Sequence, residues 1–164
     1  MVSQTLHQPV MLDEVVATLQ VKQGGHYIDA TFGNGGYSCA ILQSADCQLM
    51  AIDQDPDAIA RGQNLVKEFA PRFTLAHGRF SQMRDLLDHH YAAEDIAGGV
   101  DGIVFDLGVC STQLDQAERG FSFQKDGPLD MRMSQDGLDA AEVVNTASES
   151  EIADILYRYG DERA

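Results

Sequence analysis

The chain has 164 residues, 44% of them hydrophobic, which predicts a globular domain with a real core. No run approaches the ~20 apolar residues of a membrane span, no secretory signal begins the chain, and the cysteines form no CxxC pair, so we expect reduced thiols in a cytoplasmic protein. The formal net charge of −15 argues, taken alone, against binding to RNA or DNA, although plain solubility also accounts for it.

Helical and strand patterns alternate along the first two thirds of the chain. Gly24 and Gly25 are expected to end the first helix, and Asp55 with Pro56 should begin the third. The alternation predicts parallel pairing, so the fold class is α/β and doubly wound. Helices are predicted over 11–19, 35–44, from 55 onward and over 81–91, and strands over 26–32, 48–53, 73–78 and 100–108. The last of these strands is apolar enough to be buried on both faces.

The pattern changes after Gly108. About thirty residues show no clear periodicity, and so long a run is either functional or disordered. Its aromatic and apolar residues argue against disorder. Two short helices are predicted next, over 140–146 and 150–159, and Ser148 with Glu151 forms a capping box for the second.

The stretch DATFGNGGYS, residues 29–38, places three glycines directly after the first predicted strand. Gly33, Gly35 and Gly36 let the main chain adopt positive φ and approach a ligand closely. Asp53 ends the second strand, twenty positions after Gly33. A carboxylate there can accept both ribose hydroxyls of a nucleoside, while a helix-capping or solvated acid is the alternative.

The kind of nucleoside follows from two residues of this stretch. The dinucleotide fingerprint G-x-G-x-x-G fails at Ser38, which speaks against a nicotinamide-dependent oxidoreductase. Asp29, on the strand ahead of the turn, would repel a pyrophosphate but attract an ammonium or sulfonium group. We therefore expect S-adenosyl-L-methionine as the cofactor, with a capping role at the turn as the alternative for Asp29.

Two residues after the later strands are further candidates. Asp106 ends the fourth strand, which should neighbour the first, so its carboxylate could orient an amine nucleophile or take its proton; a turn-initiating Asp is the alternative. Phe80 could pack on an adenine ring or belong to the core. Cys110 is interpreted as a packing or loop residue, because it lacks a nearby basic activator.

The segments HQPVMLDEVV, DATFGNGGYS, AIDQDPDAI, FDLGVCSTQLD and ERGFSFQKDGPLDMRM, in this order, resemble the MraW family of bacterial methyltransferases from His7 to the last residue. The resemblance implies a Rossmann-like class I methyltransferase sheet and methyl transfer from S-adenosylmethionine to N4 of a cytidine in small-subunit (16S) ribosomal RNA. Tyr37 stands where the family normally has His, and Cys110 where it has Ser. The implied donor contacts are Gly35, Gly36, Tyr37, Asp53, Phe80, Asp106 and Gln113, the last from the resemblance alone.

The resemblance also divides the chain. Residues 1–108 correspond to the first half of the S-adenosylmethionine-binding domain, and residues 109–164 to the start of an inserted, loop-rich substrate-recognition region. The family continues beyond the end of this sequence, so we expect an incomplete sheet of about four parallel strands. Its fourth strand would be an uncovered apolar edge open to self-association. A catalytically inactive nucleoside-binding remnant is then the alternative function.

The ribosomal RNA partner conflicts with the negative charge of the chain. Arg119, Lys125 and Arg132 lie in the inserted loop, but nearby acids balance them. The hypothesis that resolves the conflict is that RNA contacts come mainly from the half of the family's chain that is missing here.

Overall fold

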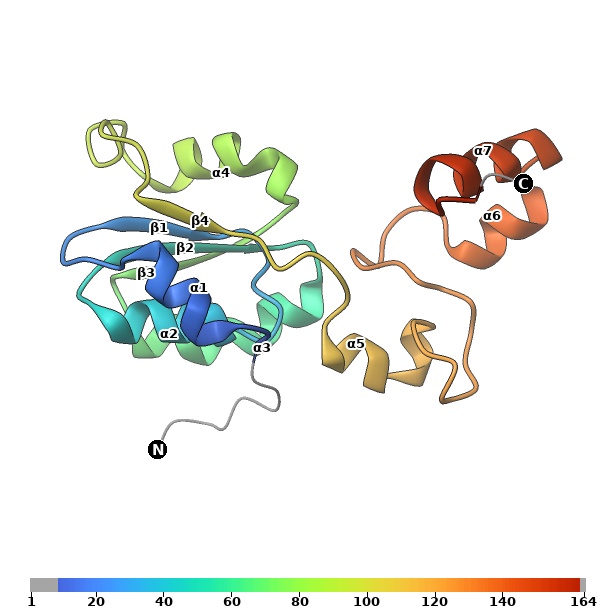
Figure 1. Ribbon diagram of the computed structural model, residues 1–164, viewed down its shortest axis with the longest axis horizontal. Coiled ribbons are helices and arrows are strands. Elements are labelled where there is room, and N and C mark those ends of the chain that lie inside the picture. The colour runs from blue at the N-terminus through green and yellow to red at the C-terminus, as the bar shows by residue number, and fades with distance from the viewer. Residues whose placement is uncertain (1–8, 163–164) are drawn as a thin grey trace. The chain divides into compact units, whose positions relative to one another are not determined.

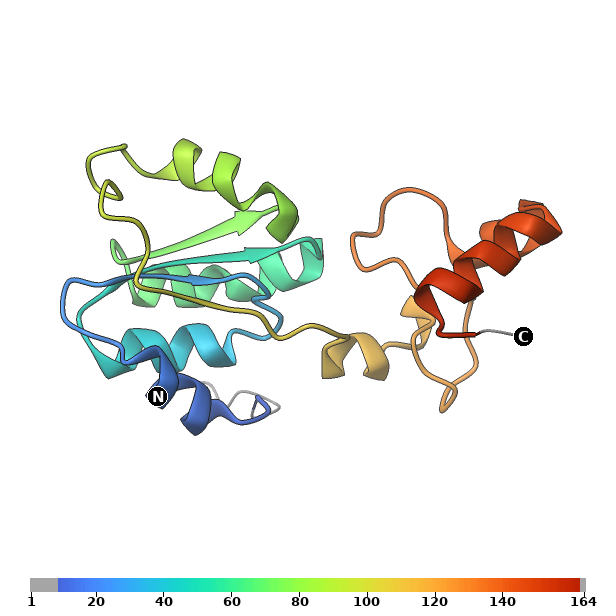
Figure 2. The same cartoon turned by 45° about the horizontal axis from the view of Figure 1, so that its top comes forward.

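The computed structural model describes residues 9–162 (Figures 1 and 2). His7, where the family resemblance begins, lies outside the described residues. The chain forms two compact units, Met1–Cys110 and Ser111–Ala164. Within residues 9–162, no helix combines the length and the apolar character that crossing a membrane requires.

The first unit is built on a four-stranded parallel sheet in the order β3-β2-β1-β4 (Figure 1). This order matches the first four strands of the doubly wound order 3-2-1-4-5-6, so the predicted α/β class is confirmed. Strand β1 has β2 and β4 as its neighbours, and Asp29 at its end pairs with Ala51 and Val104. The strands are β1 (His26–Asp29), β2 (Gln48–Asp53), β3 (Phe73–His77) and β4 (Gly102–Val104).

Helices cover both faces of this sheet (Figures 1 and 2). Helices α1 (Leu12–Leu19), α2 (Gly36–Ser44) and α3 (Pro56–Glu68) pack on the face that carries Tyr27 and Leu49. Helix α4 (Met83–His90), preceded by the 3-10 turn η1 (Phe80–Gln82), packs on the face that carries Ile28 and Met50. Neighbouring residues of a strand point to opposite faces, so β1, β2 and β3 each contribute to two separate apolar clusters, whereas β4 contributes Val104 to one.

The helix bounds follow the sequence closely, although the first helix is not ended by the residues expected to end it. The Asp55 carboxylate accepts a hydrogen bond from the Asp57 amide at 3.0 Å and caps α3, as predicted. Helix α1 ends at Leu19, as predicted, but several residues before the two glycines expected to end it. Its cap is Gln20, which adopts the left-handed conformation with φ of 49° and donates to the Ala17 carbonyl.

Strand β4 differs most from the prediction. It spans Gly102–Val104 instead of 100–108, and it is not buried on both faces, because Ile103 is 40% exposed. The physical reason is its position, since β4 is the outer strand of the sheet and pairs with β1 alone among the described residues. Strand β1 is also shorter than predicted, because the chain turns after Asp29.

The second unit contains four short helical elements joined by a long loop. The predicted helices over 140–146 and 150–159 are confirmed, the second with one additional residue at its start. The capping box of Ser148 and Glu151 is present, and Asp139 forms another with Glu142. The elements are α5 (Ser111–Asp115), the 3-10 turn η2 (Ala117–Arg119), α6 (Ala140–Thr146) and α7 (Glu149–Tyr159).

Candidate nucleoside-binding site

The predicted ribose-binding acid lies beside the glycine turn. The Gly33 amide donates to Asp53 Oδ2 at 2.7 Å, and the Asp55 amide donates to Asp53 Oδ1 at 2.8 Å. Two backbone donors therefore fix the orientation of this half-buried carboxylate. Each oxygen keeps a further lone pair that could accept a hydroxyl proton, so the geometry suits a ligand with two vicinal hydroxyls.

The three glycines of the turn face different surroundings. A side-chain carbon on Gly35 would meet the Phe32 ring at 2.8 Å, and one on Gly36 would meet the Pro9 ring at 2.3 Å. At Gly33 the nearest atoms would be Cys110 Cβ at 3.8 Å and the Thr31 carbonyl oxygen at 3.9 Å, which is ordinary van der Waals contact. Protein atoms therefore crowd the side-chain space at Gly35 and Gly36, whereas a methyl group on Gly33 would meet no clash.

Asp29 lies beneath the turn and has no exposed surface. The Ser38 hydroxyl donates to its Oδ2 at 2.7 Å, and the Thr31 amide donates to its Oδ1 at 3.2 Å. Burial raises the pKa of Asp29 to about 6, and the negative charge of Asp53 adds to this, while the bonds from Ser38 and Thr31 act against it. These partners fit the capping alternative; contact with a ligand ammonium group stays a prediction.

Asp106 and Phe80 lie on the segments that follow β4 and β3. The Asp106 amide donates to the Thr31 hydroxyl at 2.8 Å, which joins its turn to the segment after β1, and its carboxylate is exposed. Phe80 is 44% exposed and meets Phe105 edge to face, with ring centroids 5.6 Å apart. Phe80 is therefore not a core residue, and its role as an adenine platform stays a prediction.

Tyr37 makes its observed polar contact with protein. Its hydroxyl donates to the Val10 carbonyl, and the side chain is buried in the core cluster of the first unit. Burial raises the pKa of Tyr37, and the charges of Asp106 and Asp29 act in the same direction, so the phenol keeps its proton at neutral pH. Gln113 belongs to α5 of the second unit and is buried, so its contact with the donor stays a prediction.

The sequence reasoning missed three partners in this region. The sequence shows Ser38 only as a departure from the glycine fingerprint, although its hydroxyl donates a hydrogen bond to Asp29. The bond of the Thr31 hydroxyl with the Asp106 amide and the contact of Pro9 with Gly36 were also missed, because they join residues far apart in the chain. Among the described residues, no group of three or more His, Cys, Asp or Glu side chains could hold a metal ion.

Comparison with known proteins places these features in a family. The sequence model of the MraW methylase family matches residues 4–164. "Ribosomal RNA small subunit methyltransferase H" of Rhodospirillum rubrum is 59% identical over 159 residues, which cover 97% of this chain and 47% of that protein. The protein of the same name from Sphingopyxis alaskensis is 58% identical over 157 residues, which cover 96% and 46%. The chain therefore spans about half the length of these relatives.

The chain also resembles proteins of known structure. The crystal structure of a putative rRNA-methylase from Clostridium thermocellum is 25% identical and has a TM-score of 0.47, with 63% of this chain and 54% of that chain covered. The likeness is too weak to bear on the fold, which is established by the strand order itself.

Proposed function

This chain belongs to the MraW methylase family, and from that membership we propose that it transfers a methyl group from S-adenosyl-L-methionine to N4 of a cytidine in small-subunit (16S) ribosomal RNA. The observation that carries the proposal is the Asp53 carboxylate, which the Gly33 amide holds beside the glycine turn. An acid in this place is suited to the ribose of a nucleoside ligand. The names of the relatives support ribosomal RNA as the substrate, and the cytidine N4 position follows from the family resemblance.

Two buried residues favour a cationic ligand over a dinucleotide. Ser38 occupies the position of the third fingerprint glycine and is bonded to Asp29. With a pKa of about 6, Asp29 is mostly ionised at neutral pH and places a negative charge under the start of α2. A pyrophosphate would be repelled there, whereas an ammonium or sulfonium group would be attracted. The same geometry speaks against the nicotinamide alternative.

Each proposed contact has a definite role. Asp53 would accept the ribose hydroxyls, Gly33 would let the ligand approach the main chain, and the exposed ring of Phe80 would pack on the adenine. When bound, the donor supplies a methyl group on a positively charged sulfur. Asp106, two residues after the end of β4, the strand beside β1, would accept a hydrogen bond from the cytidine amine, orient it, and take up the proton that it loses.

The basic residues of the second unit support only weak binding to phosphates. Arg119 donates to the carbonyls of Arg132 and Met133, and Lys125 donates to the Asp115 carbonyl. Arg132 is paired with Asp130. All three basic residues that the sequence singled out are thus engaged within the loop. We expect this chain to bind ribosomal RNA weakly, and a filter-binding titration that found tight binding with a steep salt dependence would contradict this.

Methyl transfer is tested with radiolabelled donor and small subunits that lack the modification. The chain should label the RNA at N4 of a cytidine, and Asp106→Asn should reduce the rate at least tenfold, because a neutral amide cannot take up the proton. Asp88→Asn, a change to an exposed acid on α4, is the matched control. A full-length relative that labels the same subunits while this chain does not would favour the nucleoside-binding remnant.

The edge of the sheet suits pairing between two copies of the chain in the cytoplasm. Strand β4 pairs with β1 alone among the described residues, and Ile103, Phe105 and Leu107 are 40%, 48% and 70% exposed. An exposed apolar edge strand is a template for pairing with another chain. Sedimentation velocity should show a dimer that Ile103→Lys abolishes, while Val144→Lys, on the exposed face of α6, leaves it unchanged.

A further inference from the structure

The segment Pro9–Met11 lies across the glycine turn. The Pro9 ring occupies the space that a side chain on Gly36 would fill, since a carbon built there would lie 2.3 Å from Pro9 Cγ and 2.7 Å from Pro9 Cδ. The Val10 carbonyl, one residue further on, accepts the hydrogen bond from Tyr37. The side chains of Val10 and Met11 are 72% and 62% exposed. The segment is therefore attached to the turn through the Pro9 ring and the Val10 carbonyl, while the side chains of Val10 and Met11 face solvent.

Tyr37 is a rigid anchor for this segment. It follows Gly36 at the start of α2, and its ring is 6% exposed within the core cluster. Its raised pKa keeps the phenol protonated, so the hydroxyl stays available as a donor. The Val10 carbonyl belongs to an exposed segment that can instead bond to water. The hydrogen bond from the Tyr37 hydroxyl therefore favours the state in which residues 9–11 are attached to the glycine turn.

We propose that residues Pro9–Met11 form a strap over the glycine turn and that Tyr37 is the positioning residue that latches it. Tyr37 then sets the lifetime of the bound donor through the strap, without touching the donor. This part of the inference rests on the proposed function, because it requires the turn to hold S-adenosylmethionine. A closed strap keeps the backbone at Gly36 in its binding conformation, and an open strap frees it.

Tyr37→Phe removes the latch and keeps the ring in the core. One hydrogen bond is lost while the Val10 carbonyl regains water, so the population of the open strap should rise about tenfold. Hydrogen–deuterium exchange of the amides of residues 10–15 should accelerate by the same factor. Dissociation of S-adenosylhomocysteine, followed by stopped flow, should become about five to ten times faster for the same reason.

Tyr27→Phe is the matched control. Tyr27 is also buried, and its hydroxyl accepts from the Lys22 amide at 3.0 Å and donates to the Gln20 carbonyl at 3.5 Å, beyond the other end of α1. This variant should accelerate exchange at residues 20–23 and leave both residues 10–15 and donor dissociation unchanged. Pro9→Ala, which removes the ring over Gly36 and keeps the phenol, should act in the same direction as Tyr37→Phe.

Distinct results overturn the inference. Faster donor dissociation in Tyr37→Phe without faster exchange at residues 10–15 would mean that the phenol contacts the donor directly. Faster exchange with unchanged dissociation would mean that the strap does not control the donor. Unchanged exchange in both Tyr37→Phe and Pro9→Ala would mean that there is no latch. A wild-type chain that binds no donor would instead overturn the proposed function. The hydrogen-exchange rates of residues 10–15 would then be the test of the latch.

Discussion

The Gly33 amide donates to the Asp53 carboxylate at 2.7 Å and so joins the turn after β1 to the end of β2. The two residues are twenty positions apart, but the parallel register aligns Asp29 with Ala51, and the chain after β1 continues beside β2, where the Phe32 amide donates to the Ile52 carbonyl at 2.9 Å. The bond fixes the carboxylate and the turn as one structural unit. A ligand that binds the acid therefore meets a backbone that is already oriented, which lowers the entropic cost of binding.

Asp53→Asn tests the ribose contact. An amide keeps the shape of the side chain but loses the charge, and hydrogen bonds to charged groups contribute about 1.5–3 kcal/mol, so the affinity for S-adenosylhomocysteine should fall roughly 10- to 100-fold. Isothermal titration calorimetry measures the change. Asp101→Asn is the control, because the Asp101 carboxylate also accepts from a backbone amide, that of His26 at 2.9 Å, but at the opposite end of the sheet. Equal losses in both variants would contradict a ribose contact at Asp53.

Local sequence signals predicted the parts of the fold that depend on local contacts. Helix α3 begins where predicted, because Asp55, Pro56 and Asp57 supply a cap, a fixed φ and a charge that suits the helix dipole. Strand β2 was predicted with its observed bounds, because its apolar run is buried along most of its length. The contact between Gly33 and Asp53 followed from the α/β pattern, which brings the ends of neighbouring strands together.

The missed features depend on contacts that no local pattern encodes. Pro9 lies over Gly36 because the chain before α1 folds back on the turn, so the glycine there signals protein contact as well as ligand approach. The exposure of Ile103 follows from the place of β4 as the outer strand among the described residues, and the apolar character of the strand alone cannot reveal this place. The short extent of β1 reflects the bond between Asp29 and the Thr31 amide, which bends the chain early.

Substitutions at Gly33 and Gly35 should separate folding from binding. Gly35→Ala places a carbon 2.8 Å from the Phe32 ring at a φ of +78°, and should lower the free energy of unfolding by about 2–4 kcal/mol. Gly33→Ala meets no clash, since the nearest atom is Cys110 Cβ at 3.8 Å, and at a φ of +55° it should cost only about 1–2 kcal/mol in backbone strain. Its affinity for S-adenosylhomocysteine should nevertheless fall more than tenfold, because the new methyl group occupies the space proposed for the ligand. Urea unfolding and calorimetry measure the two effects, and unchanged affinity in Gly33→Ala would exclude a ligand there.

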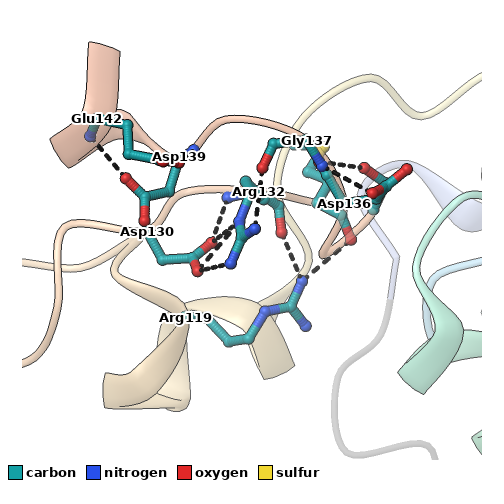
Figure 3. Close-up of polar contacts among 9 residues, drawn as sticks. Arg119, Asp130, Arg132, Asp136, Gly137, Asp139 and Glu142 are labelled. Carbon is teal, nitrogen blue, oxygen red and sulfur yellow. Dashed lines mark hydrogen bonds and ion pairs between the residues drawn. The ribbon is translucent and has the colours of Figure 1, made fainter. Parts of the chain in front are cut away.

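Arg119 should hold the loop of the second unit together. Its guanidinium donates to the carbonyls of Arg132 and Met133, both at 3.1 Å, while Arg132 is paired with Asp130 and donates to the Gly137 carbonyl (Figure 3). The ammonium group of a lysine lacks the planar fork of donors, so Arg119→Lys should accelerate hydrogen exchange over residues 130–137 about tenfold.

Arg84→Lys is the control for this loop variant, because Arg84 is 80% exposed and makes an ion pair of 3.9 Å with Asp88 on the surface of α4. Such a pair contributes little to stability, so exchange over residues 130–137 should stay at the wild-type rate. A lysine at residue 119 that left the loop equally protected would show that the two carbonyl contacts are dispensable.

The buried carboxylate of Asp29 should make stability depend on pH. Its pKa rises from 3.8 to about 6 on folding, chiefly through burial, so the folded protein binds this proton more tightly than the unfolded chain. The resulting stabilisation is complete below pH 3.8 and is lost as the pH rises through about 6. Asp29→Asn cannot ionise, so its free energy of unfolding relative to wild type should increase by about 3 kcal/mol between these limits.

Urea unfolding of wild type and Asp29→Asn across this pH range measures the difference between their free energies of unfolding. The other acids titrate in both proteins, so their contribution cancels in this difference. Ser38→Ala provides an internal check, because the Ser38 hydroxyl bonds to the ionised form and holds the pKa of Asp29 down. Without this bond the pKa of Asp29 should rise further, so the loss of stability in Ser38→Ala should begin at the same pH as in wild type, extend to higher pH and be larger. If the free energies of unfolding of Asp29→Asn and wild type differed by the same amount at every pH, the Asp29 carboxylate would be hydrated in solution. There would then be no buried charge beneath the turn.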